Sequence, residues 1–183
     1  TQRRRQRQMC IRDRIMTDDI KKRLDVVLVA GGKYHDIDFA RLELLKLLAE
    51  DDRIRTRVYE DYSNLHAISN ADFLITYTCD VRPTLEQQKV LRDFVANGKR
   101  WLALHGTNSI LQFLSDGRVD CPRVAPIFME TLGSQFLSHP PIEPYTVTVA
   151  DGDHHLVEGV EPFETNDELY LMETHGELHV LLE

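Results

Sequence analysis

The most informative stretch of this sequence is LDVVLVAGG, residues 24–32. Its apolar, β-branched run is typical of a strand that is buried on both faces of a parallel sheet, and the glycine pair predicts a tight turn at its end. Phe39 and a series of leucines then recur at helical spacing through residue 50, which predicts a helix that covers this strand. A strand followed by a covering helix is the repeating unit of α/β folds.

Similar signals continue to residue 104. Further strands are predicted over residues 53–60, 73–78 and 101–104, and a helix begins at the capping box Thr84-Leu-Glu-Gln87 and ends at Asn97-Gly98. These elements predict an α/β fold with a doubly wound, mostly parallel sheet and helices on both faces. In such sheets ligands bind beyond the carboxyl ends of the strands.

The pattern is looser after residue 110. Short helices are predicted over residues 110–114 and 125–132, and further strands over residues 145–150, 168–171 and 178–182. The chain then stops in an apolar run without a closing helix. We therefore expect a domain that is truncated at its C-terminus.

The formal net charge of −8 is spread unevenly over the 183 residues. Residues 1–23 hold nine Lys or Arg and three Asp, so we interpret them as a basic arm, disordered or artefactual, and residues 24–183 as one domain. That domain is strongly acidic, which excludes nucleic acid and anionic membrane surfaces as partners. No stretch approaches the roughly 20 apolar residues of a membrane span. Three dispersed cysteines form neither a disulfide framework nor a zinc ribbon, which indicates a reducing compartment, the cytoplasm.

Polar residues follow the first strand. Gly31 and Gly32 permit a ligand to approach backbone N–H groups, and His35 and Asp36 come directly afterwards. We interpret the glycines and Asp36 as ligand-binding and His35 as a catalytic or metal-binding residue. The alternative is a plain turn in which Asp36 caps the next helix.

His105 follows the fourth predicted strand and precedes Gly106, Thr107 and Asn108. This arrangement resembles a nucleophile elbow, where a side chain is presented at the edge of the sheet. An imidazole in that place favours general acid–base work or metal ligation over covalent acyl transfer. Gly106, Thr107 and Asn108 are then candidate ligand-binding residues. The alternative is a histidine with only a structural role at a helix start.

Four other segments carry side chains that can do chemistry. His139 lies in a rigid Ser-His-Pro-Pro segment and is a candidate ligand-binding residue or a loop residue. Asp167 and Glu168 precede a predicted strand, and one of the two carboxylates is expected to point inward as a base or metal ligand; the alternative is a solvated strand end. We interpret residues 153–155, Asp-His-His, as an exposed turn. Cys79 has no neighbouring histidine in the sequence and is interpreted as structural.

Five motifs taken together resemble the ThuA-like, or trehalose-utilisation, family. They occur in order at residues 31–36, 104–106, 132–140, 153–160 and 167–170. The resemblance implies a class I glutamine-amidotransferase-like α/β fold. It also implies a role in carbohydrate utilisation, on a trehalose-like glycoside or an oxidised sugar derivative, so that the partner is a small-molecule carbohydrate. The oligomeric state stays open, with a homo-oligomer among the expectations.

The resemblance also assigns roles to individual residues. The amidotransferase elbow carries a cysteine nucleophile where this chain has His105, so glutamine hydrolysis through a thiolate is not expected. His35, His105 and Glu168 fall on motif positions expected to converge, with His139 as a fourth. They would serve as acid–base catalysts or bind a divalent metal such as Zn²⁺. The family usually has proline where this chain has His155. The alternatives are a non-catalytic sugar-binding or assembly module and, less favoured, a Cys-dependent amidotransferase or peptidase.

Overall fold

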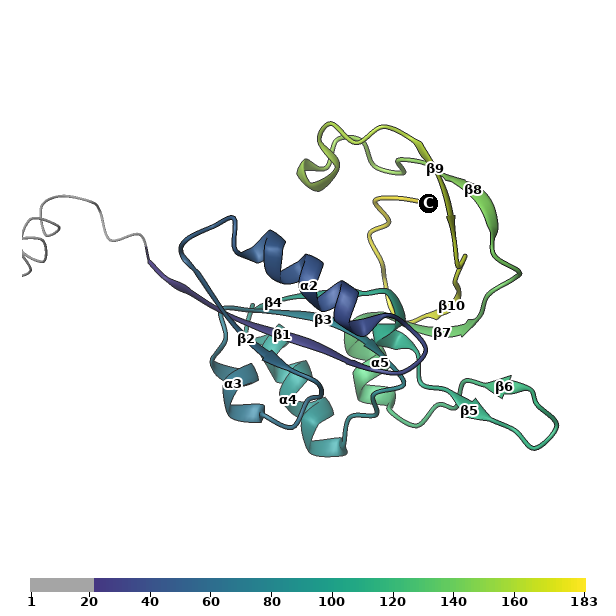
Figure 1. The fold of residues 1–183 in the computed structure, drawn as a ribbon, viewed down its shortest axis with the longest axis horizontal. Coiled ribbons are helices and arrows are strands. Elements are labelled where there is room, and N and C mark those ends of the chain that lie inside the picture. Colours follow the sequence, from purple (N-terminus) through teal and green to yellow (C-terminus); the bar gives the residue numbers. More distant parts are fainter. Residues whose placement is uncertain (1–21) are drawn as a thin grey trace, which may run out of the picture.

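The computed structural model describes residues 22–183, so nearly all of the basic arm expected over residues 1–23 lies outside the described residues. Its centre is a four-stranded parallel sheet with the order β2-β1-β3-β4 (Figure 1). The strands are β1 (Leu24–Gly32), β2 (Ile54–Tyr59), β3 (Phe73–Cys79) and β4 (Arg100–Leu104). The predicted α/β fold with a parallel sheet is confirmed.

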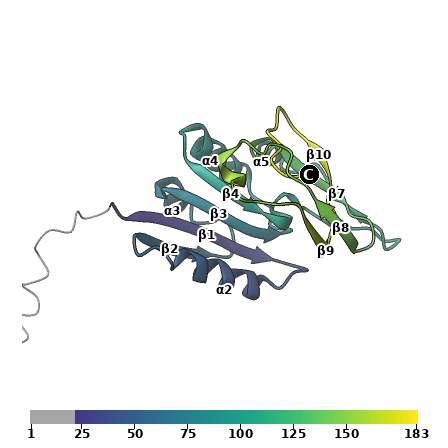
Figure 2. The ribbon, with the colours of Figure 1, turned by 90° about the horizontal axis from the view of Figure 1, so that it is seen from above.

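Helices lie on both faces of this sheet, as Figures 1 and 2 show. One face is covered by α2 (Ile37–Leu48). The other face is covered by α3 (Leu65–Asn70), α4 (Leu85–Ala96) and α5 (Pro126–Leu132). Among the described residues, none of the helices is both long and apolar enough to cross a membrane.

The apolar run of β1 supplies both halves of the core. Val27 and Val29 belong to the cluster beneath α3, α4 and α5, while Val26, Leu28 and Ala30 belong to the cluster beneath α2. Successive side chains of a strand point to opposite faces, so a strand covered on both faces is apolar at every position. This explains why the sequence of β1 shows no alternation.

The helix boundaries follow from local hydrogen bonds. Thr84 Oγ1 accepts from the Gln87 backbone N–H at 3.3 Å, and Gln87 Oε1 accepts from the Thr84 N–H at 2.8 Å, so the predicted capping box is present. Helix α5 ends at Gly133, whose φ of +79° suits the left-handed cap that glycine favours. The short helix α3, which begins after its N-cap Asn64, was not predicted.

The order of the strands determines where a ligand can bind. The chain passes from β1 to β2 on one side and then returns to β3 on the other side of β1. The connections therefore diverge between β1 and β3, which leaves a crevice at the carboxyl ends of these strands.

The second half of the chain forms three two-stranded antiparallel sheets beside the carboxyl end of the parallel sheet (Figures 1 and 2). They pair β5 (Gln112–Phe113) with β6 (Val119–Asp120), β7 (Ser134–Ser138) with β10 (Leu171–Thr174), and β8 (Glu143–Val147) with β9 (Phe163–Asp167). Short 3₁₀ turns span His105–Asn108 and His155–Val157.

Three predictions for this half were wrong. Residues 110–114 form no helix; their apolar residues lead into the hairpin of β5 and β6, whose turn contains Gly117 at a φ of +83°. The strand predicted over residues 168–171 does not form, because residues 168–170 connect β9 to β10. Residues 178–182 contribute only one isolated bridge, between Leu182 and Val149. Five-residue apolar runs do not distinguish helix, strand and loop by periodicity.

Candidate active site

Two histidines meet at the carboxyl edge of the parallel sheet. His35 follows β1 and His105 follows β4, and Nδ1 of His35 lies 3.3 Å from Nε2 of His105. Their ring centroids are 4.3 Å apart with the planes nearly perpendicular. The structure therefore brings together the two imidazoles that the sequence placed at separate strand ends.

The backbone at His105 is strained. Its φ is +48°, a left-handed conformation that non-glycine residues rarely adopt. The next residue is a tightly packed glycine, because a Cβ on Gly106 would lie 3.0 Å from the carbonyl oxygen of Thr78. Thr107 fixes the turn from beneath, since its hydroxyl donates to the carbonyl oxygen of Leu104 at 2.8 Å. The result is the sharp, strained turn of an elbow.

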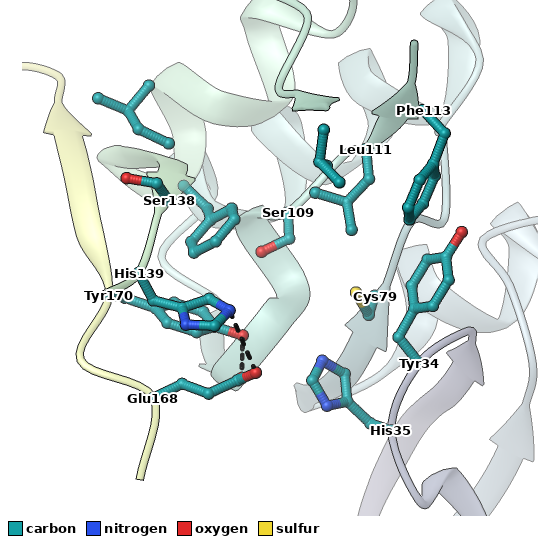
Figure 3. A pocket seen from close by; sticks show the side chains of 13 residues that line it. Tyr34, His35, Cys79, Ser109, Leu111, Phe113, Ser138, His139, Glu168 and Tyr170 are labelled. Carbon is teal, nitrogen blue, oxygen red and sulfur yellow. Dashed lines mark hydrogen bonds and ion pairs between the residues drawn. The ribbon is translucent and has the colours of Figure 1, made fainter. Parts of the chain in front are cut away.

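Glu168 reaches the same place from outside the parallel sheet. It lies between β9 and β10, and its Oε2 lies 3.3 Å from Nε2 of His105. Its other carboxylate oxygen, Oε1, lies 3.5 Å from Nε2 of His139. Figure 3 shows Glu168, His139 and Tyr170 on one side of a pocket and His35 across from them. His139 thus joins the cluster through the carboxylate of Glu168.

Two tyrosines enclose the ring of His105. Tyr77 stacks on it with centroids 5.6 Å apart and an interplanar angle of 14°, and Tyr170 lies 5.0 Å away. Burial and the neighbouring His35 lower the pKa of His105, while Glu168 acts in the opposite direction. The imidazole of His105 is therefore neutral at pH 7 and can accept a proton or bind a metal ion.

The hydroxyl of Tyr170 completes the polar cluster. It donates to Oε2 of Glu168 at 3.3 Å, and its oxygen lies 3.2 Å from Nε2 of His105. Burial, followed by the charge of Glu168, raises the pKa of Tyr170, so the phenol keeps its proton. Nε2 of His105 thus faces His35, Glu168 and Tyr170 at once. One imidazole nitrogen carries a single hydrogen or a single lone pair and cannot bond to all three.

His35 and Glu168 line a pocket of about 340 Å³, whereas His105 lines a second pocket next to it. This second pocket, of about 310 Å³, shares the side chain of Tyr170 with the first. The first is lined by Tyr34, His35, Cys79, Ser109, Leu111, Phe113, Val119, Phe136, Leu137, Ser138, His139, Glu168 and Tyr170. Its size is in the range of small-molecule sites.

The predicted ligand-binding glycines and Asp36 have structural tasks in this arrangement. Gly31 and Gly32 lie within β1, and a Cβ on either would come within 2.0 Å of a carbonyl oxygen, that of Glu60 or that of Cys79. Asp36 caps α2 by accepting from a backbone N–H at 2.9 Å. Ligand binding by these three residues stays a prediction.

Thr107 and Asn108 are buried beneath the site. The hydroxyl of Thr107 bonds to β3 and β4, and the amide of Asn108 donates to the hydroxyl of Ser134 at 2.8 Å. Both residues also line the second pocket. They hold the elbow against the neighbouring strands, and their contact with a ligand stays a prediction.

Other candidates lie outside the cluster. Cys79 is buried at the end of β3, and burial raises its pKa to about 11, so it is a thiol at neutral pH. His154 and His155 lie in an exposed turn, with His155 at the start of a 3₁₀ helix. Within residues 22–183, the one group of three potential metal ligands with mutual distances under 4.8 Å is His35, His105 and Glu168.

Sequence reasoning missed the two tyrosines that enclose His105. Tyr170 follows Glu168 by two residues, and Tyr77 lies near the end of a predicted strand, beside the strand that ends at His105. An aromatic residue at the carboxyl end of a neighbouring strand was the available signal for Tyr77. Nothing in the sequence pattern indicated that Tyr170 faces His105.

Comparisons with known proteins show the family to which the chain belongs. The family model ThuA, described as trehalose utilisation, matches residues 25–183. A ThuA-like protein from Bacteroides uniformis has a similar structure, with a TM-score of 0.71, 16% identity and coverage of 92% of this chain and 70% of that chain. One from Parabacteroides merdae has a TM-score of 0.60, 17% identity and coverage of 88% and 68%. No curated protein matches this chain.

Both structural matches are below 20% identity and therefore support the fold. The family description adds support for a role related to trehalose utilisation. Since the family model extends over nearly all of the described residues, this chain belongs to the ThuA, or trehalose utilisation, family.

Proposed function

We propose that this protein is an enzyme that acts on a trehalose-like glycoside or an oxidised sugar derivative, with His35, His105 and Glu168 as its reaction centre. The observation that carries the proposal is the position of Nε2 of His105, 3.3 Å from both Nδ1 of His35 and Oε2 of Glu168. Strained backbone at His105 and a pocket beside the cluster support a catalytic role.

The residues themselves supply acid–base chemistry. His105, neutral because of its lowered pKa, is suited to accept a proton from a sugar hydroxyl or from an attacking water. Glu168 stabilises the imidazolium that results, since its carboxylate lies beside the same ring nitrogen. The phenol of Tyr170, whose pKa is raised, provides a hydrogen-bond donor for an oxygen that gains negative charge.

The same atoms fit a divalent metal ion. Two imidazoles and a carboxylate form the three-ligand set of many catalytic zinc sites. Ligand atoms about 2.0–2.1 Å from a tetrahedral ion would be about 3.4 Å from one another. The two separations from Nε2 of His105 are both 3.3 Å, and all three ligand atoms lie within 4.8 Å of one another. An ion would also satisfy the crowded nitrogen that one hydrogen bond cannot. Bound there, a divalent ion would polarise a sugar oxygen or activate water.

A cysteine-dependent mechanism has less support. The pKa of Cys79 is raised to about 11 by burial, which is the opposite of what an activated thiolate needs. The elbow position carries His105 instead of a thiol. We therefore retain the imidazole–carboxylate chemistry and set aside glutamine hydrolysis.

The test compares wild-type protein with His105→Ala and Glu168→Gln, using His155→Ala as a control because His155 lies in an exposed turn outside the cluster. Turnover is followed with trehalose and with its keto derivatives, and zinc content by elemental analysis after chelation and reloading. We expect both site variants to lose turnover by at least about 10²-fold and the control to retain it. One zinc per chain that disappears in both site variants would establish the metal form of the chemistry.

A non-catalytic sugar-binding module is the competing function. It predicts that wild-type protein binds these sugars without converting them and that His105→Ala leaves the affinity unchanged. That pair of results would contradict the proposed enzyme.

A further inference from the structure

Two aromatic side chains form the wall of the pocket that faces Glu168 and His139 (Figure 3). The rings of Tyr34 and Phe113 have centroids 5.6 Å apart at an angle of 45°. Although they touch each other, Tyr34 is 56% exposed and Phe113 is 58% exposed. Two large aromatic rings thus remain mostly open to solvent in one pocket, next to a polar cluster, where a ligand could cover them.

Tyr34 is held in an unfavourable backbone conformation. Its φ is +72°, in the left-handed region where a bulky side chain is strained and where glycine or asparagine would cost less. Such strain is concentrated in protein sites that bind ligands or carry out reactions. Tyr34 also directly precedes His35, so the same turn presents the aromatic ring and the imidazole to one pocket.

Phe113 reaches the pocket from the hairpin of β5 and β6, which projects from the body of the protein (Figure 1). The base of this hairpin is fixed to the end of β3. Oδ1 of Asp80 accepts from the backbone N–H of Leu111 at 3.1 Å, and the N–H of Asp80 donates to the carbonyl oxygen of Ser109 at 2.9 Å. Phe113 therefore has a defined place opposite Glu168.

We infer that Tyr34 and Phe113 form an aromatic platform for the second sugar ring of a disaccharide, whose first ring lies at His35 and Glu168, next to His105. This inference rests on the proposed function and makes the substrate class more specific: a disaccharide is favoured over a monosaccharide. One face of a pyranose exposes only C–H groups, so it covers an aromatic ring without burying a hydroxyl. The pocket thus has a polar end for reaction and an apolar end for recognition.

The test measures the affinities of trehalose and glucose by calorimetry for the full chain and for Phe113→Ala and Tyr34→Asn. Asparagine is chosen because it tolerates the left-handed backbone at position 34. Phe39→Ala is the matched control, since Phe39 is 62% exposed on α2 and does not line the pocket. We expect each platform variant to weaken trehalose binding about 2- to 12-fold, as the loss of one aromatic contact would, and to leave glucose binding within about twofold.

Two results would overturn the platform: an unchanged preference for trehalose over glucose in both variants, or an equal loss for the two sugars. Turnover of His105→Ala, measured in parallel, separates this inference from the proposed function. If His105→Ala loses turnover but the platform variants bind trehalose and glucose as the wild type does, only the platform is refuted. If the wild-type protein shows no turnover but the platform variants lose the preference for trehalose, the proposed enzyme is refuted and the platform is supported.

Discussion

Nε2 of His105 lies 3.3 Å from Nδ1 of His35, although 70 residues separate the two histidines in the chain. The two residues follow β4 and β1, which lie on either side of β3 in the same parallel sheet. A hydrogen-bonded sheet fixes both backbones, so the pair of imidazoles is in place before any ligand arrives. Preorganisation of this kind is what a reaction centre requires.

The pKa of His105 can be checked directly in metal-free protein. We expect it below 6.5 in wild type, lower still in Glu168→Gln because the carboxylate raises it, and higher in His35→Gln because that neighbour lowers it. The unfolded imidazole titrates near 6.5 and the folded pKa is lower, so protonation of this residue makes the folded state less stable as the pH falls below about 7. NMR titration of the ring resonances measures all three values. A wild-type pKa above 6.5 would contradict the neutral imidazole.

The strain at His105 predicts that glycine is more stable than alanine at this position. Alanine at position 105 keeps the unfavourable φ of +48°, whereas glycine adopts it freely. We expect His105→Gly to have a free energy of unfolding about 1 kcal/mol above that of His105→Ala. Urea denaturation of the two variants gives the difference. Equal stabilities would mean that the turn relaxes and stores no strain.

Gly31 should be among the least replaceable residues of β1. A Cβ there would lie 2.0 Å from the carbonyl oxygen of Glu60, so Gly31→Ala must separate two paired strands. We expect a loss of at least about 3 kcal/mol in the free energy of unfolding. Gly152→Ala is the matched control, because its Cβ would meet only Val149 at 3.9 Å and should change stability by less than about 1 kcal/mol.

The thiol of Cys79 should react slowly with alkylating reagents. A pKa of about 11 in place of 9 lowers its thiolate population at pH 8 by about a hundredfold. The experiment uses a variant in which Cys10 and Cys121 are serine, so that Cys79 alone is observed, and compares folded protein with protein unfolded in urea. Modification as fast in the folded as in the unfolded protein would show that the thiol is accessible and unperturbed.

The parallel half of the fold could be predicted from the sequence because its signals are local. The apolar run of β1, the capping box at Thr84 and the glycine after α5 each determine a boundary through nearby atoms. Helix α3 was missed because six residues contain too few turns for a helical period to be visible. Placing His35 and His105 at one edge required only the rule that ligands bind beyond the carboxyl ends of parallel strands.

The other side of the site could not be derived in this way. Glu168 was a candidate from its place before a predicted strand, but only the family resemblance grouped it with the histidines, and Tyr170 was not selected at all. Both lie on a connection between two antiparallel sheets, and their contact with His105 depends on how those sheets pack against the parallel one. Tertiary packing of this kind leaves no periodic trace in the residues themselves.

Residues 168–170 connect β9 of one antiparallel pair to β10 of another, so the position of the Glu168 carboxylate depends on both pairs. The two histidines, by contrast, follow strands of the central sheet. Displacement of either antiparallel pair, β8 with β9 or β7 with β10, would move Glu168 away from His105 and leave His35 and His105 in contact. Opening of the C-terminal half would thus disassemble the reaction centre while the parallel sheet and its helices remain folded, so loss of activity should precede global denaturation.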